Sequence, residues 1–287
     1  MSLNASRLSF DQLQFYEREG YLVLPNLLDD RDMAPARDAM MQKVDGMADD
    51  LFTAGRVRDK LQGRPFEVRL AELFAELTEQ DFLAYGRSWR DRLPGYFVLM
   101  NNPKILDVVE SLIGGEIFAS PIYNVRPKVP KVAAGAVPWH QDKSYWPGAN
   151  ANPVITVWIP LVDATLDNGC LHIKPRTHKL TLMDHHEETY SGTGYREVDE
   201  PKQGRRPAMA LPVKKGTAIL FNDRCLHMST PNQSNAVRWS VDLRYQPTDQ
   251  DPMRDLGMGF LARSRLAPGR VATLEDWLAG RPEHLEP

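Results

Sequence analysis

Cysteine is scarce in this sequence, which contains only Cys170 and Cys225 among its 287 residues. Two thiols are too few for a disulfide framework or a cysteine-rich zinc site, and they suit a reducing compartment. No stretch approaches the roughly 20 apolar residues of a membrane-spanning helix. The first residues show no apolar run followed by a small-residue cleavage site. We therefore expect a cytoplasmic protein with no membrane partner.

A large excess of charge of either sign is also missing. The formal net charge is -3, which gives no electrostatic reason to expect nucleic acid or an anionic membrane as a partner. Hydrophobic residues make up 42% and charged residues 25% of the chain, the balance of a soluble globular protein. The length suits one large domain or two small ones.

The N-terminal part of the chain predicts helices. Ser9 and Gln12 form a possible capping box, and Gly20 suits a left-handed C-cap, so we expect a helix between them. The apolar segment YLVLPNLL then predicts a short strand. Helical spacing of apolar residues in DDRDMAPARDAMMQKVDGMADDLF predicts a second helix, and NPKILDVVESLIGG predicts a third that ends at a glycine pair.

From about residue 116 the pattern changes to short segments rich in β-branched and aromatic residues, separated by turn sequences such as DNG, KKG and PNQSN. Many short strands predict a barrel or a sandwich. We expect one domain over residues 1–287: helical support to about 115, a β-barrel core over 116–250 and a C-terminal extension over 251–287. Residues 184–208 are polar and lack a period, which indicates either a lid over a site or a mobile surface excursion.

The segment PWHQDKSYWP contains two metal-ligand types, His140 and Asp142, two positions apart. On a strand, or at its end, alternate side chains project to the same side, which suits two ligands of one metal. A third ligand has to come from elsewhere in the chain. The candidate histidines are His172, His178, His185, His186 and His227.

His227 stands out because Arg238 follows it by eleven residues, in the predicted strand RWSVDLRY. An arginine facing a barrel interior needs a carboxylate, either Asp242 on its own strand or an acidic ligand, and Ser240 could add a hydroxyl donor to the latter. Two histidines and one carboxylate are the ligand set of non-haem Fe(II) oxygenases. By geometry alone, structural histidines and an Arg238–Asp242 ion pair both remain open.

Five segments, in this order, resemble the phytanoyl-CoA dioxygenase family of Fe(II)- and 2-oxoglutarate-dependent oxygenases. They are FYEREGYLVLPNLLD, NNPKILDVVESLIG, WHQDKSYWP, VWIPLVDATLDNGCLHIKPRTHK and GTAILFNDRCLHMSTPNQSNAVRWSVDLRY. The fourth segment departs from the family pattern, because Arg176 and Thr177 stand where Gly-Ser is usual. The resemblance covers nearly the whole chain. It implies a mainly β fold in which a helical N-terminal layer supports a double-stranded β-helix, the cupin-like jelly roll.

The resemblance also implies roles for individual residues. His140, Asp142 and His227 would bind iron, and Arg238 would pair with the distal carboxylate of 2-oxoglutarate, with Ser240 beside it. Three further residues match positions that face the cosubstrate in some relatives: Asn124, Lys128 and Thr156. Trp146 has two readings, a wall of the substrate pocket or a core residue.

The implied reaction uses Fe(II), 2-oxoglutarate and O2, and it releases succinate and CO2 while a small or medium organic substrate is oxidised. Asp142 favours hydroxylation, because halogenases of this broad group replace the carboxylate with a small residue. Desaturation or ring closure uses the same kind of iron centre. Two alternatives stay open: a non-catalytic barrel that binds a metal or small ligand, and a cupin-like metalloenzyme that needs no 2-oxoglutarate.

Overall fold

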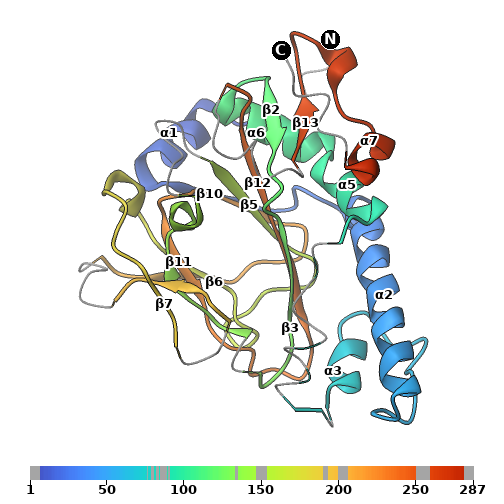
Figure 1. Cartoon of the computed structure of the whole chain (residues 1–287). Helices are drawn as coiled ribbons and strands as arrows, with labels where there is room; N and C mark the ends of the chain where they lie inside the picture. Colours follow the sequence, from blue (N-terminus) through green and yellow to red (C-terminus); the bar gives the residue numbers. More distant parts are fainter. Residues whose placement is uncertain are drawn as a thin grey trace.

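The computed structural model describes most of the chain. The described residues are 7–75, 77–78, 81, 84, 89, 91–132, 135–146, 154–189, 193–199, 206–249 and 259–280. Within them, two antiparallel sheets face each other as a double-stranded β-helix, so the predicted jelly roll is confirmed (Figure 1). None of the described helices is both long enough and apolar enough to cross a membrane.

The larger sheet has seven described strands. It carries Arg126, Arg238 and Arg244, which line a pocket between the two sheets. In spatial order its strands are β1 (Tyr21–Leu24), β10 (Ala218–Asn222), β5 (Ile155–Pro160), β12 (Arg238–Pro247), β2 (Ile117–Ala119) and β13 (Phe260–Arg263), with β3 (Asn124–Lys128) also paired to β12. Two edge strands, β1 and β13, lie outside the range 116–250 that we expected for the β core. The described part of the C-terminal extension therefore completes the sheet; residues 251–258 and 281–287 are outside the described residues.

The smaller sheet has four described strands in the order β4 (Val137–His140), β11 (Leu226–Ser229), β6 (Leu171–Lys174) and β9 (Met209–Leu211). A separate pair, β7 (His186–Glu187) and β8 (Arg196–Glu197), lies within the predicted excursion. β4 and β11 pair so that His140 and His227 are direct partners across the ladder.

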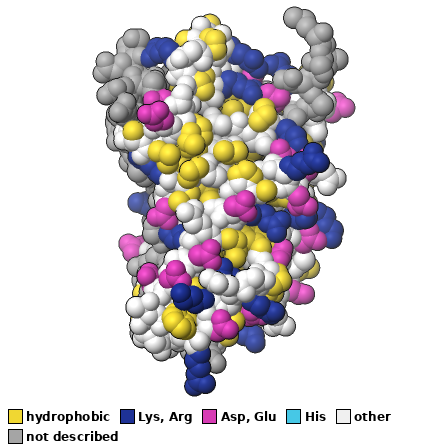
Figure 2. All heavy atoms as spheres, turned by 90° about the vertical axis from the view of Figure 1, so that its right-hand side faces the viewer, with side chains coloured by type: hydrophobic (Ala, Val, Ile, Leu, Met, Phe, Trp, Pro, Cys, Tyr) yellow, Lys and Arg dark blue, Asp and Glu magenta, His cyan; other side chains and the backbone are white. Residues whose placement is uncertain are grey.

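Helices cover the outer face of the larger sheet (Figure 1). They are α1 (Phe10–Glu19), α2 (Asp30–Thr53), α3 (Arg69–Leu73), α5 (Pro94–Met100), α6 (Pro103–Ile113) and α7 (Leu274–Ala279). The capping box of Ser9 and Gln12 is present, and Gly20 ends α1 at φ 84°, as the sequence predicts. Figure 2 looks onto the side that carries α2; there, basic and acidic side chains interleave among scattered hydrophobic ones.

Strand β12 shows why the pocket lies between the sheets. Its odd-numbered residues join the hydrophobic cluster shared with the helices; they are Trp239, Val241, Leu243 and Tyr245. Side chains alternate between the two faces of a strand, so the even-numbered residues face the opposite sheet. Arg238, Asp242 and Arg244 accordingly line the internal pocket, so the predicted strand RWSVDLRY does turn Arg238 toward the barrel interior.

Candidate metal centre

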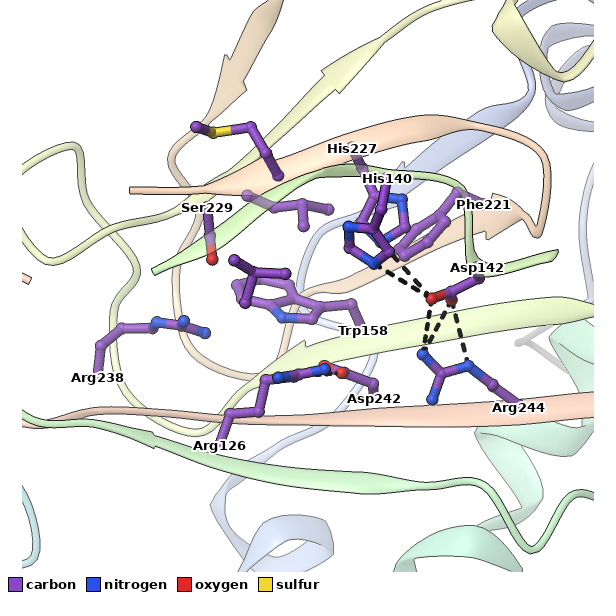
Figure 3. A pocket seen from close by; sticks show the side chains of 13 residues that line it. Arg126, His140, Asp142, Trp158, Phe221, His227, Ser229, Arg238, Asp242 and Arg244 are labelled. Atoms are coloured by element: carbon purple, nitrogen blue, oxygen red, sulfur yellow. Dashed lines mark hydrogen bonds and ion pairs between the residues drawn. The ribbon is translucent and has the colours of Figure 1, made fainter. Parts of the chain in front are cut away.

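His140, Asp142 and His227 converge at one end of the pocket (Figure 3). The ladder pairing of β4 with β11 sets the two imidazoles side by side, with ring centroids 4.1 Å apart. Asp142 opens a 3-10 turn immediately after β4. Its Oδ1 lies 3.5 Å from His140 Nε2 and 3.9 Å from His227 Nε2. One ion can therefore reach all three side chains.

The backbone fixes both imidazoles in the tautomer that a metal requires. His140 Nδ1 lies 2.9 Å from the carbonyl oxygen of Pro138, and His227 Nδ1 lies 2.9 Å from that of Cys225. A carbonyl oxygen only accepts hydrogen bonds, so each Nδ1 carries the proton and donates it. Each Nε2 then presents its lone pair toward Asp142, the arrangement that metal-ligating histidines show.

Electrostatics keep His227 and Asp142 in the protonation states of metal ligands. Burial lowers the pKa of His227 to about 3, with the neighbouring His140 adding to the effect, so His227 is neutral at physiological pH. Burial alone would raise the pKa of Asp142, but the Arg244 guanidinium and the two imidazoles hold that pKa well below its ordinary value. A neutral imidazole and an ionised carboxylate both fit a divalent ion.

Arg244 and Thr156 hold the Asp142 carboxylate. Arg244 Nη2 donates to Oδ1 at 3.0 Å and to Oδ2 at 2.9 Å, and its Nε donates to Oδ2 at 3.2 Å. Thr156 Oγ1 donates to Oδ2 at 2.7 Å. The structure thus places the Thr156 hydroxyl on the aspartate, whereas the resemblance implied a hydroxyl facing the cosubstrate.

Arg238 lies at the opposite end of the pocket from Asp142 (Figure 3). It is 1% exposed, its Nη1 donates to Ser240 Oγ at 2.5 Å, and its Nε has no hydrogen-bond partner. Burial lowers its pKa only to about 10, so it stays protonated. Its guanidinium also stands 5.4 Å from the ring centroid of Trp158.

The alternative pairing of Arg238 with Asp242 is not found. Asp242 instead receives Arg126 Nε at 2.6 Å and Asn124 Nδ2 at 3.3 Å, both from the neighbouring strand β3. Among the described residues, no carboxylate lies within ion-pair distance of Arg238. A buried guanidinium without a carboxylate is costly, so it fits an acidic ligand.

Lys128 and Trp146 each contact a residue that lines the pocket, Ser229 and Arg244 respectively. Lys128 Nζ donates to Ser229 Oγ at 2.7 Å and to the carbonyl oxygen of Thr230 at 2.5 Å. Burial, with Arg238 nearby, lowers the pKa of Lys128 well below its ordinary value. The Trp146 indole N–H donates to Asp223 at 3.1 Å, and the ring is 4% exposed. The Arg244 guanidinium stands 5.4 Å from the Trp146 ring centroid, and a substrate-wall role for Trp146 stays a prediction.

The described part of the 184–208 excursion packs against the metal-binding segment. Val198 N donates to the carbonyl oxygen of Trp139 at 2.8 Å, and Arg196 N donates to Tyr145 Oη at 3.0 Å. Arg126 Nη1 donates to Tyr195 Oη at 3.0 Å, which joins the excursion to the pocket wall. Residues 190–192 and 200–205 are outside the described residues, and a lid function remains a prediction.

Sequence reasoning missed several residues of the pocket wall. Trp158 and Phe221 line it from the larger sheet, Ser229 lines it from β11, and Arg126 and Arg244 contribute the charged contacts described above. One signal was available: Arg244 shares the inward face of β12 with Arg238, so a second interior arginine needed its own carboxylate.

The sequence of this chain is similar to a known protein family and to several characterised proteins. The family model described as Phytanoyl-CoA dioxygenase (PhyH) matches residues 16–240. The peroxisomal phytanoyl-CoA dioxygenase of Mus musculus is 27% identical over 258 residues, covering 86% of this chain and 71% of the relative. The 1-deoxypentalenic acid 11-beta-hydroxylase of Streptomyces arenae is 25% identical over 249 residues, covering 82% and 80%.

Among solved structures, the non-heme alpha ketoglutarate dependent carbocyclase SnoK from nogalamycin biosynthesis superposes with a TM-score of 0.56 at 21% identity, covering 85% of each chain. A jelly roll with two histidines and one aspartate between its sheets is the architecture of Fe(II)- and 2-oxoglutarate-dependent oxygenases. The chain belongs to the phytanoyl-CoA dioxygenase family.

Proposed function

We propose that this dioxygenase hydroxylates a small or medium organic molecule, with Fe(II) held by His140, Asp142 and His227. Bound Fe(II) supplies the activation of O2 that is coupled to conversion of 2-oxoglutarate into succinate and CO2. The protein contributes ligand geometry, cosubstrate orientation and exclusion of water. The presence of Asp142 supports hydroxylation, because a carboxylate occupies the position that a halide would need.

The observation that carries the proposal is the buried Arg238 at the far end of a pocket that contains the three ligands. Arg238 would take the distal carboxylate of 2-oxoglutarate, since a guanidinium binds a carboxylate with planar, paired hydrogen bonds. Ser240 orients that guanidinium by accepting from its Nη1. Asn124 and Lys128 act one step away, through Asp242 and Ser229 respectively.

A cytoplasmic location is part of the proposal, supported by two buried free thiols, Cys170 and Cys225, that suit a reducing compartment. The partner is a small-molecule substrate. The test is a substrate panel with Fe(II), ascorbate and 2-oxoglutarate, in which succinate is measured and the atmosphere contains isotopically labelled O2. Hydroxylation predicts one labelled oxygen atom in succinate and one in the product.

Three outcomes of the panel would contradict the proposal in different ways. A product that has lost two hydrogens without gaining labelled oxygen would mean desaturation or ring closure. Tight metal binding without any O2-dependent succinate would favour a non-catalytic binding barrel. An oxidised product that forms without 2-oxoglutarate would instead indicate a cupin-like metalloenzyme.

A further inference from the structure

The two oxygens of the Asp142 carboxylate have different surroundings. Oδ1 is the oxygen that faces His140 Nε2 and His227 Nε2, at 3.5 and 3.9 Å. It receives one hydrogen bond, from Arg244 Nη2 at 3.0 Å. Oδ2 receives three, from Thr156 Oγ1 at 2.7 Å, Arg244 Nη2 at 2.9 Å and Arg244 Nε at 3.2 Å. These donors fill the lone pairs of Oδ2, whereas Oδ1 keeps one directed toward the imidazoles.

The donors to Oδ2 come from neighbouring strands in fixed register. Thr156 on β5 and Arg244 on β12 are direct partners across the ladder, so they reach the carboxylate from adjacent positions of the larger sheet. Arg244 is also held elsewhere: its Nη1 donates to the carbonyl oxygen of Ile122 at 3.1 Å, and its guanidinium lies over Trp146. Thr156 is fully buried and Arg244 is 4% exposed, so water does not compete for Oδ2.

We propose that Arg244 and Thr156 are positioning residues that restrict Asp142 to binding iron through Oδ1 alone. This inference rests on the proposed function. A carboxylate can bind a metal through one oxygen or through both. A bidentate aspartate would take four positions of a six-coordinate ion together with the two histidines. With Oδ2 saturated, Asp142 would hold the ion through Oδ1 alone and would leave room beside the three protein ligands for 2-oxoglutarate and O2.

The test separates metal affinity from cosubstrate affinity. Mn(II) binding is followed by electron paramagnetic resonance of the free ion, and 2-oxoglutarate binding by the visible charge-transfer band of the anaerobic Fe(II) protein. Thr156→Val removes the shortest of the three hydrogen bonds to Oδ2 at nearly constant volume. We expect Mn(II) affinity equal to or tighter than that of the wild type, and about a tenfold weaker 2-oxoglutarate affinity, because a second Asp142 oxygen on the ion would compete with the cosubstrate.

The matched control is Thr156→Ser, which keeps the hydroxyl and should restore cosubstrate affinity. Arg244→Met should weaken 2-oxoglutarate affinity relative to Mn(II) affinity more strongly than Thr156→Val does. It removes two hydrogen-bond donors to Oδ2 and a cation beside the Asp142 carboxylate. Arg69→Met controls for loss of a buried arginine, since Arg69 pairs with Asp45 at 2.5 Å in the helical layer. If Arg244→Met does not fold, the Thr156 pair carries the test alone.

Unchanged 2-oxoglutarate affinity in Thr156→Val would overturn the inference. So would a parallel loss of metal and cosubstrate affinity, because that pattern indicates a merely structural role. Failure of the proposed function looks different: the wild-type protein itself would bind no Mn(II) or would form no charge-transfer band.

Discussion

At the residue scale, the described residues pair the charged side chains that line the pocket, with one exception. Arg244 pairs with Asp142 and Arg126 pairs with Asp242. Arg238 has only Ser240 as a hydrogen-bond partner among the described side chains, although it is almost completely buried. A dicarboxylate in the pocket would offset the cost of burying this lone cation, which supports the proposal that Arg238 anchors 2-oxoglutarate.

Arg238→Met should weaken 2-oxoglutarate binding by about a hundredfold, the loss expected for a buried, charge-assisted carboxylate pair. Mn(II) affinity should stay unchanged, because no metal ligand is altered. Both constants can be measured by titration of one preparation, with Mn(II) affinity as the internal control. A variant that binds 2-oxoglutarate as tightly as the wild type would show that the anchor is another residue.

Arg176 explains the departure from the Gly-Ser pattern. It adopts φ 64°, a left-handed conformation that favours glycine. Its side chain donates to Glu19 from Nε and Nη2, both at 2.8 Å, and its backbone N–H donates to the Glu19 carbonyl oxygen at 2.7 Å. The ion pair therefore compensates for a strained backbone and joins the end of α1 to the smaller sheet.

Arg176→Gly should relieve the backbone strain and remove the ion pair together. Hydrogen bonding to Arg176 lowers the pKa of Glu19 from 4.5 to about 2. The pair therefore contributes stability above pH 4.5, and that contribution is lost as the pH falls toward 2. Urea unfolding of the metal-free proteins should show the wild type gaining on the variant as the pH rises across this window. A stability difference independent of pH between 2 and 6 would contradict the assignment.

At the element scale, the sequence predicted the features that depend only on neighbouring residues within one segment. The capping box at Ser9, the end of α1 at Gly20 and the inward face of β12 all follow from spacing along one segment. Contacts between segments far apart in the sequence could not be predicted. Arg244 and Asp142 are 102 positions apart, and the alternation of side chains along a strand shows which face Arg244 lies on but not which residue it contacts. The phytanoyl-CoA dioxygenase resemblance supplied the three ligands, but the donors to Oδ2 required the structure.

The packing of α5 against α2 depends on Gly95. A Cβ at this position would stand 1.9 Å from the backbone oxygen of Pro35, too close for either helix to adjust cheaply. Gly95→Ala should therefore destabilise the protein by about 2–4 kcal/mol in chemical unfolding, as overpacking of a core does.

Gly46→Ala is the matched control, because Gly46 lies within α2 and its added methyl group would meet nothing within 4 Å. It should stabilise the protein by about 0.5–1 kcal/mol through helix propensity. Equal effects of the two substitutions would contradict the close approach of α5 and α2.

At the scale of the whole molecule, the metal centre joins the two sheets. The imidazoles come from β4 and β11 of the smaller sheet, whereas the groups that hold Asp142 come from β5 and β12 of the larger one. An ion bound to all three ligands therefore connects both halves of the jelly roll, and its binding free energy adds to the stability of the fold.

Mn(II) at about a hundred times its dissociation constant should stabilise the folded protein by about 2.7 kcal/mol, seen as a higher unfolding temperature that a chelator reverses. Asp142→Ala should lose most of this gain, because the only anionic ligand is removed. Equal stabilisation of the wild type and the variant would place the ion elsewhere.

The dependence on Fe(II) and 2-oxoglutarate is tested most directly by mixing both with the wild-type protein under anaerobic conditions and then admitting O2. We predict a weak visible charge-transfer band that requires both components, is absent from His227→Ala, and disappears with O2 as succinate forms. A protein saturated with Fe(II) that gives neither the band nor succinate would contradict the assignment of this chain as a 2-oxoglutarate-dependent dioxygenase.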